Sequence, residues 1–203
     1  KAKVVKIIEK HDVILIADEI YYDLNYSGDK VSFCSYKSIK DKLIYLSGFS
    51  KNYAMTGYRV GYAASNKEII DAMMKIHQYS MLCASIFAQE AAIEALRNCE
   101  SDKNEMITEY NNRRKYIYHW ITEELKLDCI EPLGAFYIFP SVEKTGLTAK
   151  EFSTGLLKSE KVAVVPGDAF GDMWNKNIRI SYAASLKEIE LAMKKMKKFI
   201  NTI

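Results

Sequence analysis

The sequence predicts an α/β fold in which part of a sheet with flanking helices is followed by a smaller α+β lobe. Short, largely apolar runs at residues 13–17, 43–46 and 59–64 are typical of strands. The first run is continuous and β-branched, which favours a buried parallel strand. Helical patterns with polar caps then dominate, and weaker strand patterns recur near residues 134–139, 162–165 and 178–182.

Composition excludes several classes of protein. Of 203 residues 49% are hydrophobic and 27% charged, which indicates a folded core. Basic and acidic residues nearly balance at 29 and 26, so we expect no nucleic-acid partner. The four cysteines form no Cys-x-x-Cys pair, which predicts reduced thiols, a cytoplasmic protein and no metal site. Without an apolar run of membrane-spanning length, no membrane association is expected.

The helices can be placed from their caps. Ser65–Asn66, Ser85 and Ser101–Asp102 can open helices that end near residues 79, 97 and 126, and capping boxes at Thr148 and Ser185 open two more. Residues 1–10 resemble the end of an amphipathic helix, so we expect the chain to be the C-terminal portion of a longer protein. These patterns predict a sheet domain over 1–100, a linking helix over 101–127 and a small domain over 128–203.

Common catalytic templates are missing, but polar residues follow the predicted strands. The chain has no nucleophile elbow, no glycine-rich dinucleotide motif and no P-loop. Asp18 and Tyr21 follow the first strand, Lys51 follows the second, and Arg59 opens the third. Taken alone, Asp18 is more often a helix cap or loop hydrogen-bonder, Lys51 a solvated rim residue and Arg59 an ion-pair partner. Their spacing predicts no more than an anion or carbonyl site.

Five ordered segments together narrow this interpretation. Residues 47–62 (SGFSKNYAMTGYRVGY) closely resemble the lysine motif of class I aminotransferases, the fold-type I enzymes that use pyridoxal 5′-phosphate (PLP). The upstream DEIY at 18–21 and the downstream GAFY at 134–137, PGDAFG at 166–171 and NIRIS at 177–181 resemble further elements of that family. The AMTG variant at 54–57 is most similar to the aspartate and aromatic branch. The resemblance implies part of the PLP-binding large-domain sheet followed by the small C-terminal domain.

The resemblance also implies roles at the cofactor. Lys51 would bond covalently to PLP and, once freed by substrate, move a proton as general base and then general acid. Asp18 would pair with the pyridine nitrogen, and Tyr21 would donate to the ring 3-oxygen. Arg59 would bind the cofactor phosphate, with Ser50 as a weaker candidate for the same group.

On the substrate side, the resemblance implies that Arg179 binds the α-carboxylate of the amino acid. Without it, a strand arginine that pairs on the surface is the preferred interpretation of Arg179. Phe136 and Phe170 are candidates for the substrate mouth, although core packing is the simpler role for both.

The implied activity is amino-group transfer between an α-amino acid of aspartate or aromatic type and a 2-oxo acid. Family members are usually homodimers and about twice as long, so we expect this chain, lacking the N-terminal half, to be inactive alone. Two alternatives stay open: a PLP-dependent β-lyase, and a non-catalytic remnant or oligomerisation module. The AMTG form argues against the lyase, and the retained polar set argues against the remnant.

Overall fold

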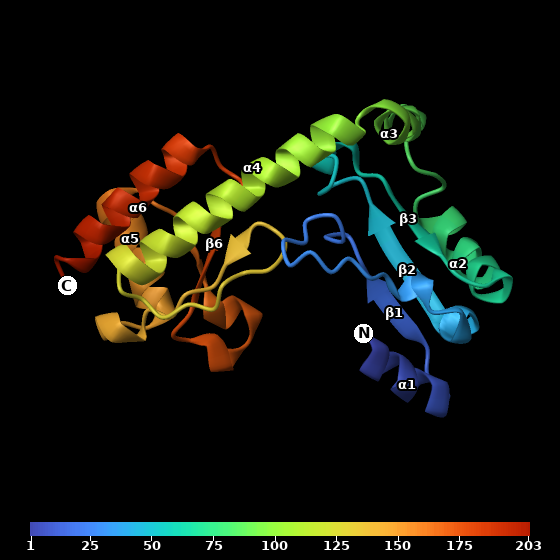
Figure 1. Ribbon diagram of the computed structural model, residues 1–203, viewed down its shortest axis with the longest axis horizontal. Coiled ribbons are helices and arrows are strands. Elements are labelled where there is room, and N and C mark those ends of the chain that lie inside the picture. Colours follow the sequence, from blue (N-terminus) through green and yellow to red (C-terminus); the bar gives the residue numbers. More distant parts are fainter. The chain divides into compact units, whose positions relative to one another are not determined.

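The computed structural model describes residues 1–203, and the chain divides into two compact units, Lys1–Ile107 and Thr108–Ile203. Figure 1 labels their helices and strands along the colour gradient of the chain. No helix combines the length and the apolar composition that a bilayer crossing requires.

The first unit holds a three-stranded sheet in the order β1-β2-β3 (Figure 1). Strand β1 runs parallel to β2, as the sequence predicts, and β2 is antiparallel to β3. The elements of this unit are α1 (Ala2–Lys10), β1 (Leu15–Asp18), β2 (Leu43–Gly48), β3 (Gly61–Ala64), α2 (Lys67–Ser80), α3 (Ile86–Asn98) and the start of α4 (Glu100–His119).

The prediction that the first strand is buried is only partly correct. Leu15 packs against a core of Val5, Ile8 and Ile39, which joins α1 to the turn before β2. Ile16 is 62% exposed, because alternate residues of a strand point to opposite faces and no element of the unit covers the second face there. The first strand is therefore buried on only one of its two faces.

The close approach of β2 and β3 depends on two glycines. Gly48 and Gly61 pair directly across the two strands. A Cβ atom on Gly61 would lie 3.0 Å from the carbonyl oxygen of Ser47, closer than a side chain tolerates without a shift. The two glycines thus bring the start of β3 against the end of β2, where the predicted polar residues lie.

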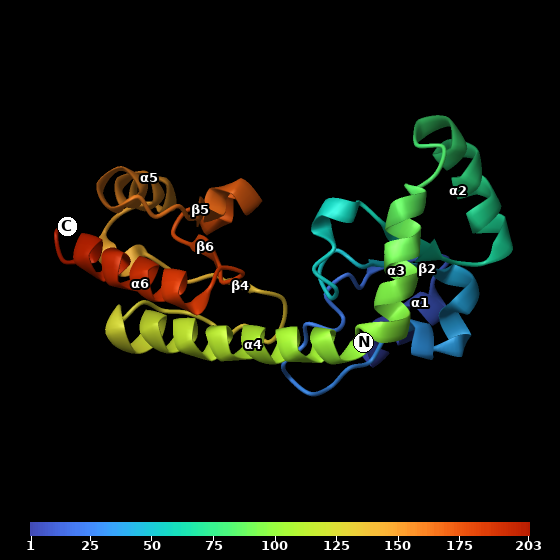
Figure 2. The ribbon, with the colours of Figure 1, turned by 90° about the horizontal axis from the view of Figure 1, so that it is seen from above.

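The second unit holds an antiparallel sheet in the order β4-β6-β5, with two helices. Helix α6 runs alongside the C-terminal part of α4 (Figures 1 and 2), and Lys197 pairs with Glu124 at 2.7 Å. The elements are the end of α4, which continues as a π-helical turn (Trp120–Glu124), β4 (Tyr137–Ile138), α5 (Ala149–Glu160), β5 (Val165–Pro166), β6 (Ile178–Ser181) and α6 (Leu186–Ile200).

The helix caps test the sequence predictions residue by residue. Both capping boxes form, with the Thr148 and Ser185 side chains accepting from the backbone three residues on. The Asn66 side chain likewise caps α2. Ser85 occupies the N-cap of α3 but makes no side-chain capping bond, so that detail of the prediction is wrong.

Two element boundaries also differ from the prediction. Helix α4 begins at Glu100, one residue before the predicted cap. The strand expected over 162–165 is reduced to Val165–Pro166, because Lys161 ends α5 in a left-handed turn and the chain reaches the sheet only at Val165.

Candidate active site

The carboxyl ends of β1 and β2 lie at the same edge of the first sheet because the two strands are parallel. Asp18 ends β1, and Lys51 follows β2 by three residues. Tyr21 lies in the segment after β1, and the Lys51 ammonium is 5.9 Å from the centre of its ring. The structure therefore brings Tyr21 and Lys51 together at the edge where open α/β sheets bind ligands.

Asp18 and its neighbour Glu19 occupy different environments, as expected for adjacent residues of a strand. The exposed Asp18 carboxylate accepts a hydrogen bond from the Ile20 backbone amide at 3.1 Å. Glu19 is buried and pairs with Lys1, while the Phe33 amide donates to it at 3.1 Å. Burial alone would raise the pKa of Glu19, but these hydrogen bonds and the lysine charge outweigh it and lower that pKa. Glu19 thus stabilises the fold, and Asp18 faces solvent.

The loop after β2 is closed by its own hydrogen bonds. The Met55 amide donates to the Phe49 carbonyl at 3.2 Å, and the Thr56 hydroxyl donates to the Ser50 carbonyl at 2.8 Å. The Phe49 and Met55 side chains are buried against Ala92 and Ala95 of α3. The loop that carries Lys51 is therefore anchored to the core at both ends.

Arg59 ends this loop and lies at the same sheet edge, two residues before β3. Its backbone is left-handed at φ 55°, a conformation uncommon for a residue with a Cβ atom. Its guanidinium donates to the Thr56 carbonyl at 2.9 Å and is otherwise exposed to solvent. A permanent positive charge thus lies in the segment that links Lys51 to β3.

A polar network next to Lys51 is absent from the sequence-based analysis. The Asn52 side-chain amide donates to Asp23 at 2.8 Å, and Lys103 lies 3.9 Å from the same carboxylate. Burial by itself would lower the pKa of Lys103, but its bond to Glu100 and the charge of Asp23 outweigh burial and raise that pKa. Because Asp23 and Asn52 follow Tyr21 and Lys51 closely in sequence, the network ties the two site segments together.

Arg179 belongs to β6 of the second unit. Its guanidinium carbon lies 4.6 Å from the centre of the Tyr137 ring and 4.7 Å from that of Phe170. Phe136, the other candidate for the substrate mouth, is buried and stacks on Tyr110 at 5.4 Å, which fits core packing. Of the two rings beside Arg179, only Phe170 is a candidate from the sequence; Tyr137, which lies between the buried Phe136 and Ile138, is not.

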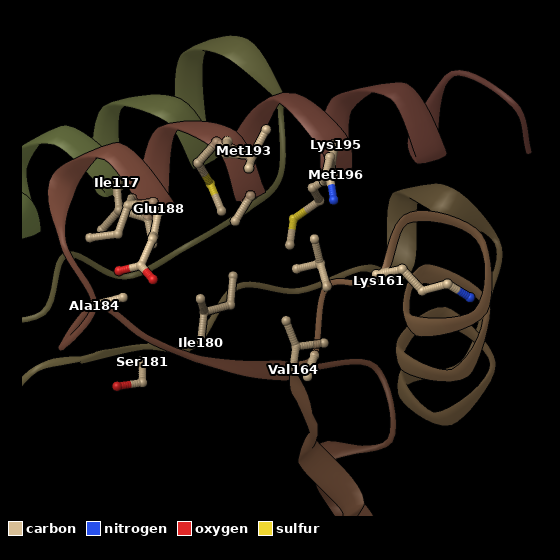
Figure 3. Close-up of a pocket in the computed structure, with 15 residues that line it drawn as sticks. Ile117, Lys161, Val164, Ile180, Ser181, Ala184, Glu188, Met193, Lys195 and Met196 are labelled. Carbon is tan, nitrogen blue, oxygen red and sulfur yellow. The ribbon is translucent and has the colours of Figure 1, made fainter.

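A cavity of about 300 Å³ in the second unit is lined by apolar side chains of β6, α6 and the segment after α5 (Figure 3). Its polar rim is already engaged, since Glu188 closes the capping box of α6 and Lys195 donates to the Glu160 carbonyl at 2.9 Å. Lys161 donates in turn to the Lys158 carbonyl at 2.9 Å. None of the predicted site residues lines this cavity.

Comparison with known proteins identifies the family of this chain. The model of the family described as "Aminotransferase class I and II" matches residues 1–196. The chain is 43% identical to an aspartate aminotransferase of Pyrococcus abyssi over 94% of its own length and 50% of the relative's. It is 39% identical to aromatic-amino-acid aminotransferase 2 of Thermococcus litoralis, again over 94% and 50%.

Solved structures similar to this chain also include aminotransferases. The aromatic aminotransferase from Pyrococcus horikoshii superposes with a TM-score of 0.93 at 38% identity, over 99% of this chain and 54% of the other. The chain thus spans about half the length of the relatives it matches. It belongs to the class I and II aminotransferase family.

Proposed function

We propose that this chain is the lysine-bearing part of a PLP-dependent aminotransferase of aspartate or aromatic type. In this proposal residues 1–100 are part of the large domain, 101–127 the linking helix and 128–203 the small domain. The observation that carries it is the meeting of Lys51 and Tyr21 at the carboxyl edge of β1 and β2, where Asp18 ends the first strand. The relatives' names supply the substrate type, an α-amino acid and a 2-oxo acid.

The chemistry of the residues at this edge fits PLP. A carboxylate, Asp18, suits a protonated pyridine nitrogen, and a phenol, Tyr21, suits the ring 3-oxygen. The primary amine of Lys51 suits the aldehyde. Arg59 suits the phosphate, because a guanidinium is charged at every physiological pH, and Ser50 of the same loop is a weaker candidate for that group.

Bound PLP supplies an electron sink for the charge that is left when an α-proton is removed. The chain's own residues position and move that proton. Lys51 would take it from the α-carbon of the amino acid as general base and would then donate it as general acid to the cofactor carbon C4′. The Ile20 amide holds the Asp18 carboxylate in place. Arg179 binds the α-carboxylate and orients the α C–H bond.

We also propose that the complete enzyme is a homodimer and that this chain alone does not turn over substrate. Its relatives are about twice as long. Large apolar side chains of α2, α3 and the turn between them are uncovered, with Ile76, Tyr79, Leu82 and Phe87 between 73% and 88% exposed. A surface of this kind is typical of one that another polypeptide covers.

A visible absorption titration with PLP tests the cofactor assignment. The wild-type chain should develop the band of lysine-bound PLP and saturate at one equivalent, and the Lys51→Ala variant should not. Lys67→Ala is the matched control, because Lys67 is exposed on α2 and pairs with Asp71. A band of equal intensity in the Lys51→Ala variant would overturn the assignment.

A further inference from the structure

The strand β6 presents Arg179 and its buried neighbours to opposite faces. Ile178 and Ile180 are 0% and 8% exposed and belong to the core, so Arg179 between them points to the other face of the sheet. Tyr137 pairs with Ser181 across β4 and β6. Residues paired in this way share a face, and Tyr137 is therefore the diagonal neighbour of Arg179 on the same face.

A second ring reaches Arg179 from the opposite neighbour in the sheet. Arg179 pairs with Val165 of β5, and Phe170 follows β5 in the 3₁₀-helix Gly167–Phe170. Both ring centres lie within 4.7 Å of the guanidinium carbon, inside the range in which a cation is attracted to an aromatic face. One ring thus comes from β4 and the other from the 3₁₀-helix that follows β5, and these two strands flank β6.

Phe170 is itself held in place by an aromatic cluster. The Phe139 ring meets it edge-on at 6.1 Å and meets Trp174 edge-on at 5.5 Å. Gly167, at the start of the turn that carries Phe170 and Trp174, has no room for a side chain, because a Cβ atom there would lie 2.3 Å from the Trp174 carbonyl oxygen. The Gly167 amide also donates to the Asn177 carbonyl at 2.7 Å, beside β6. This turn fixes the ring relative to the strand.

Arg179 differs from the other arginines of its unit. Arg113 pairs with Glu109 at 2.8 Å, and Arg114 pairs with Glu131 at 2.6 Å. None of the ion pairs in the structure involves Arg179. Stacking occupies the planar face of a guanidinium, while its N–H donors lie in the plane, where a carboxylate can accept two of them.

We propose that Tyr137 and Phe170 are positioning residues that hold the Arg179 guanidinium by stacking and so aim its donors at the substrate α-carboxylate. The inference rests on the proposed function, which gives Arg179 its ligand. The rings act through Arg179, reducing the rotational freedom that carboxylate binding would otherwise have to remove.

Side-chain NMR of the full chain labelled with ¹⁵N-arginine tests the stacking directly. Arg179→Lys identifies the Arg179 Nε–Hε signal by removing it. That signal should be ordered and shifted by ring currents in the wild type and in Tyr137→Phe. Both properties should be weakened in Tyr137→Leu and in Phe170→Leu, each of which removes one of the two rings. Tyr116→Leu is the control, because the Tyr116 ring packs on the ring of Trp120.

Titration of the same proteins with 2-oxoglutarate tests the consequence for binding. Each leucine variant should raise the Kd for 2-oxoglutarate about two- to five-fold, as expected for loss of one cation–π contact. Tyr137→Phe keeps an aromatic ring and should therefore keep the wild-type affinity. The half-exposed Phe170 can be replaced without opening the core, and far-UV circular dichroism verifies the fold of every variant.

The outcomes separate the two proposals. If Arg179→Lys binds 2-oxoglutarate as tightly as the wild type, or if the wild type does not bind it, Arg179 does not bind the carboxylate. The positioning role of Tyr137 and Phe170 is then refuted as well. If Arg179→Lys abolishes binding but both leucine variants keep the Arg179 signal and the wild-type Kd, the proposed function stands and the positioning role is refuted.

Discussion

Replacement of Asp23 by alanine should destabilise the first unit, because Asp23 links the segments that carry Tyr21 and Lys51. Asp23 accepts a 2.8 Å hydrogen bond from Asn52 and lies 3.9 Å from Lys103. A hydrogen bond to a charged group contributes about 1.5–3 kcal/mol. The longer ion pair adds at most about 1 kcal/mol, since Lys103 keeps its 2.7 Å pair with Glu100. We therefore expect a loss of about 2 kcal/mol.

Urea unfolding followed by far-UV circular dichroism measures this loss as a lower midpoint at constant slope. Asp29→Ala is the matched control, because the Asp29 side chain is exposed and only its backbone carbonyl accepts a bond, from Asn25. This control should change the free energy of unfolding by less than about 0.5 kcal/mol.

A double-mutant cycle with Asn52→Ala isolates the hydrogen bond itself. The two changes should couple by at least about 1.5 kcal/mol, because they remove the same hydrogen bond. A loss below about 0.5 kcal/mol for Asp23→Ala, or additive effects of the two changes, would refute the view that this network ties the site segments together.

Three further predictions follow from the fold. Because hydrogen bonds hold the pKa of Glu19 below its usual range, its stabilising effect should be complete above about pH 5 and be lost as pH falls through the native pKa. Acid titration of Glu19→Gln should show a weaker loss of stability, and an unchanged profile would contradict this. Gly61→Ala should cost about 1–3 kcal/mol in urea unfolding, because its Cβ meets the Ser47 carbonyl, and a neutral effect would mean that β2 and β3 can separate. Ser185→Ala should lower thermal stability by about 1 kcal/mol through loss of the α6 cap, whereas an unchanged melting temperature would refute the cap's contribution.

Features with a local cause could be predicted from the sequence. The capping boxes at Thr148 and Ser185 need only residues three apart, and both form. The parallel pairing of β1 and β2 follows from apolar runs separated by a long connection, and it places Asp18 and the Lys51 segment at one edge. The lysine motif gave the family because it is a long contiguous pattern, and the family match confirms it.

Features that depend on register or on distant contacts could not be predicted. The contact of Tyr137 with Arg179 requires the pairing of Tyr137 with Ser181, which a two-residue strand pattern does not specify. The Asp23–Asn52 bond joins residues 29 positions apart in irregular segments with no periodic signal. The exposure of Ile16 depends on which elements cover each face of the sheet, and an apolar run does not encode that.

Lys51 is the residue that we propose holds PLP in this chain. Borohydride reduction of the chain with one equivalent of PLP, followed by peptide mass mapping, tests this assignment. We expect a single modified site at Lys51, in the loop between β2 and β3, and none in the Lys51→Ala variant. Modification spread over exposed lysines such as Lys67, with no preference for Lys51, would contradict it.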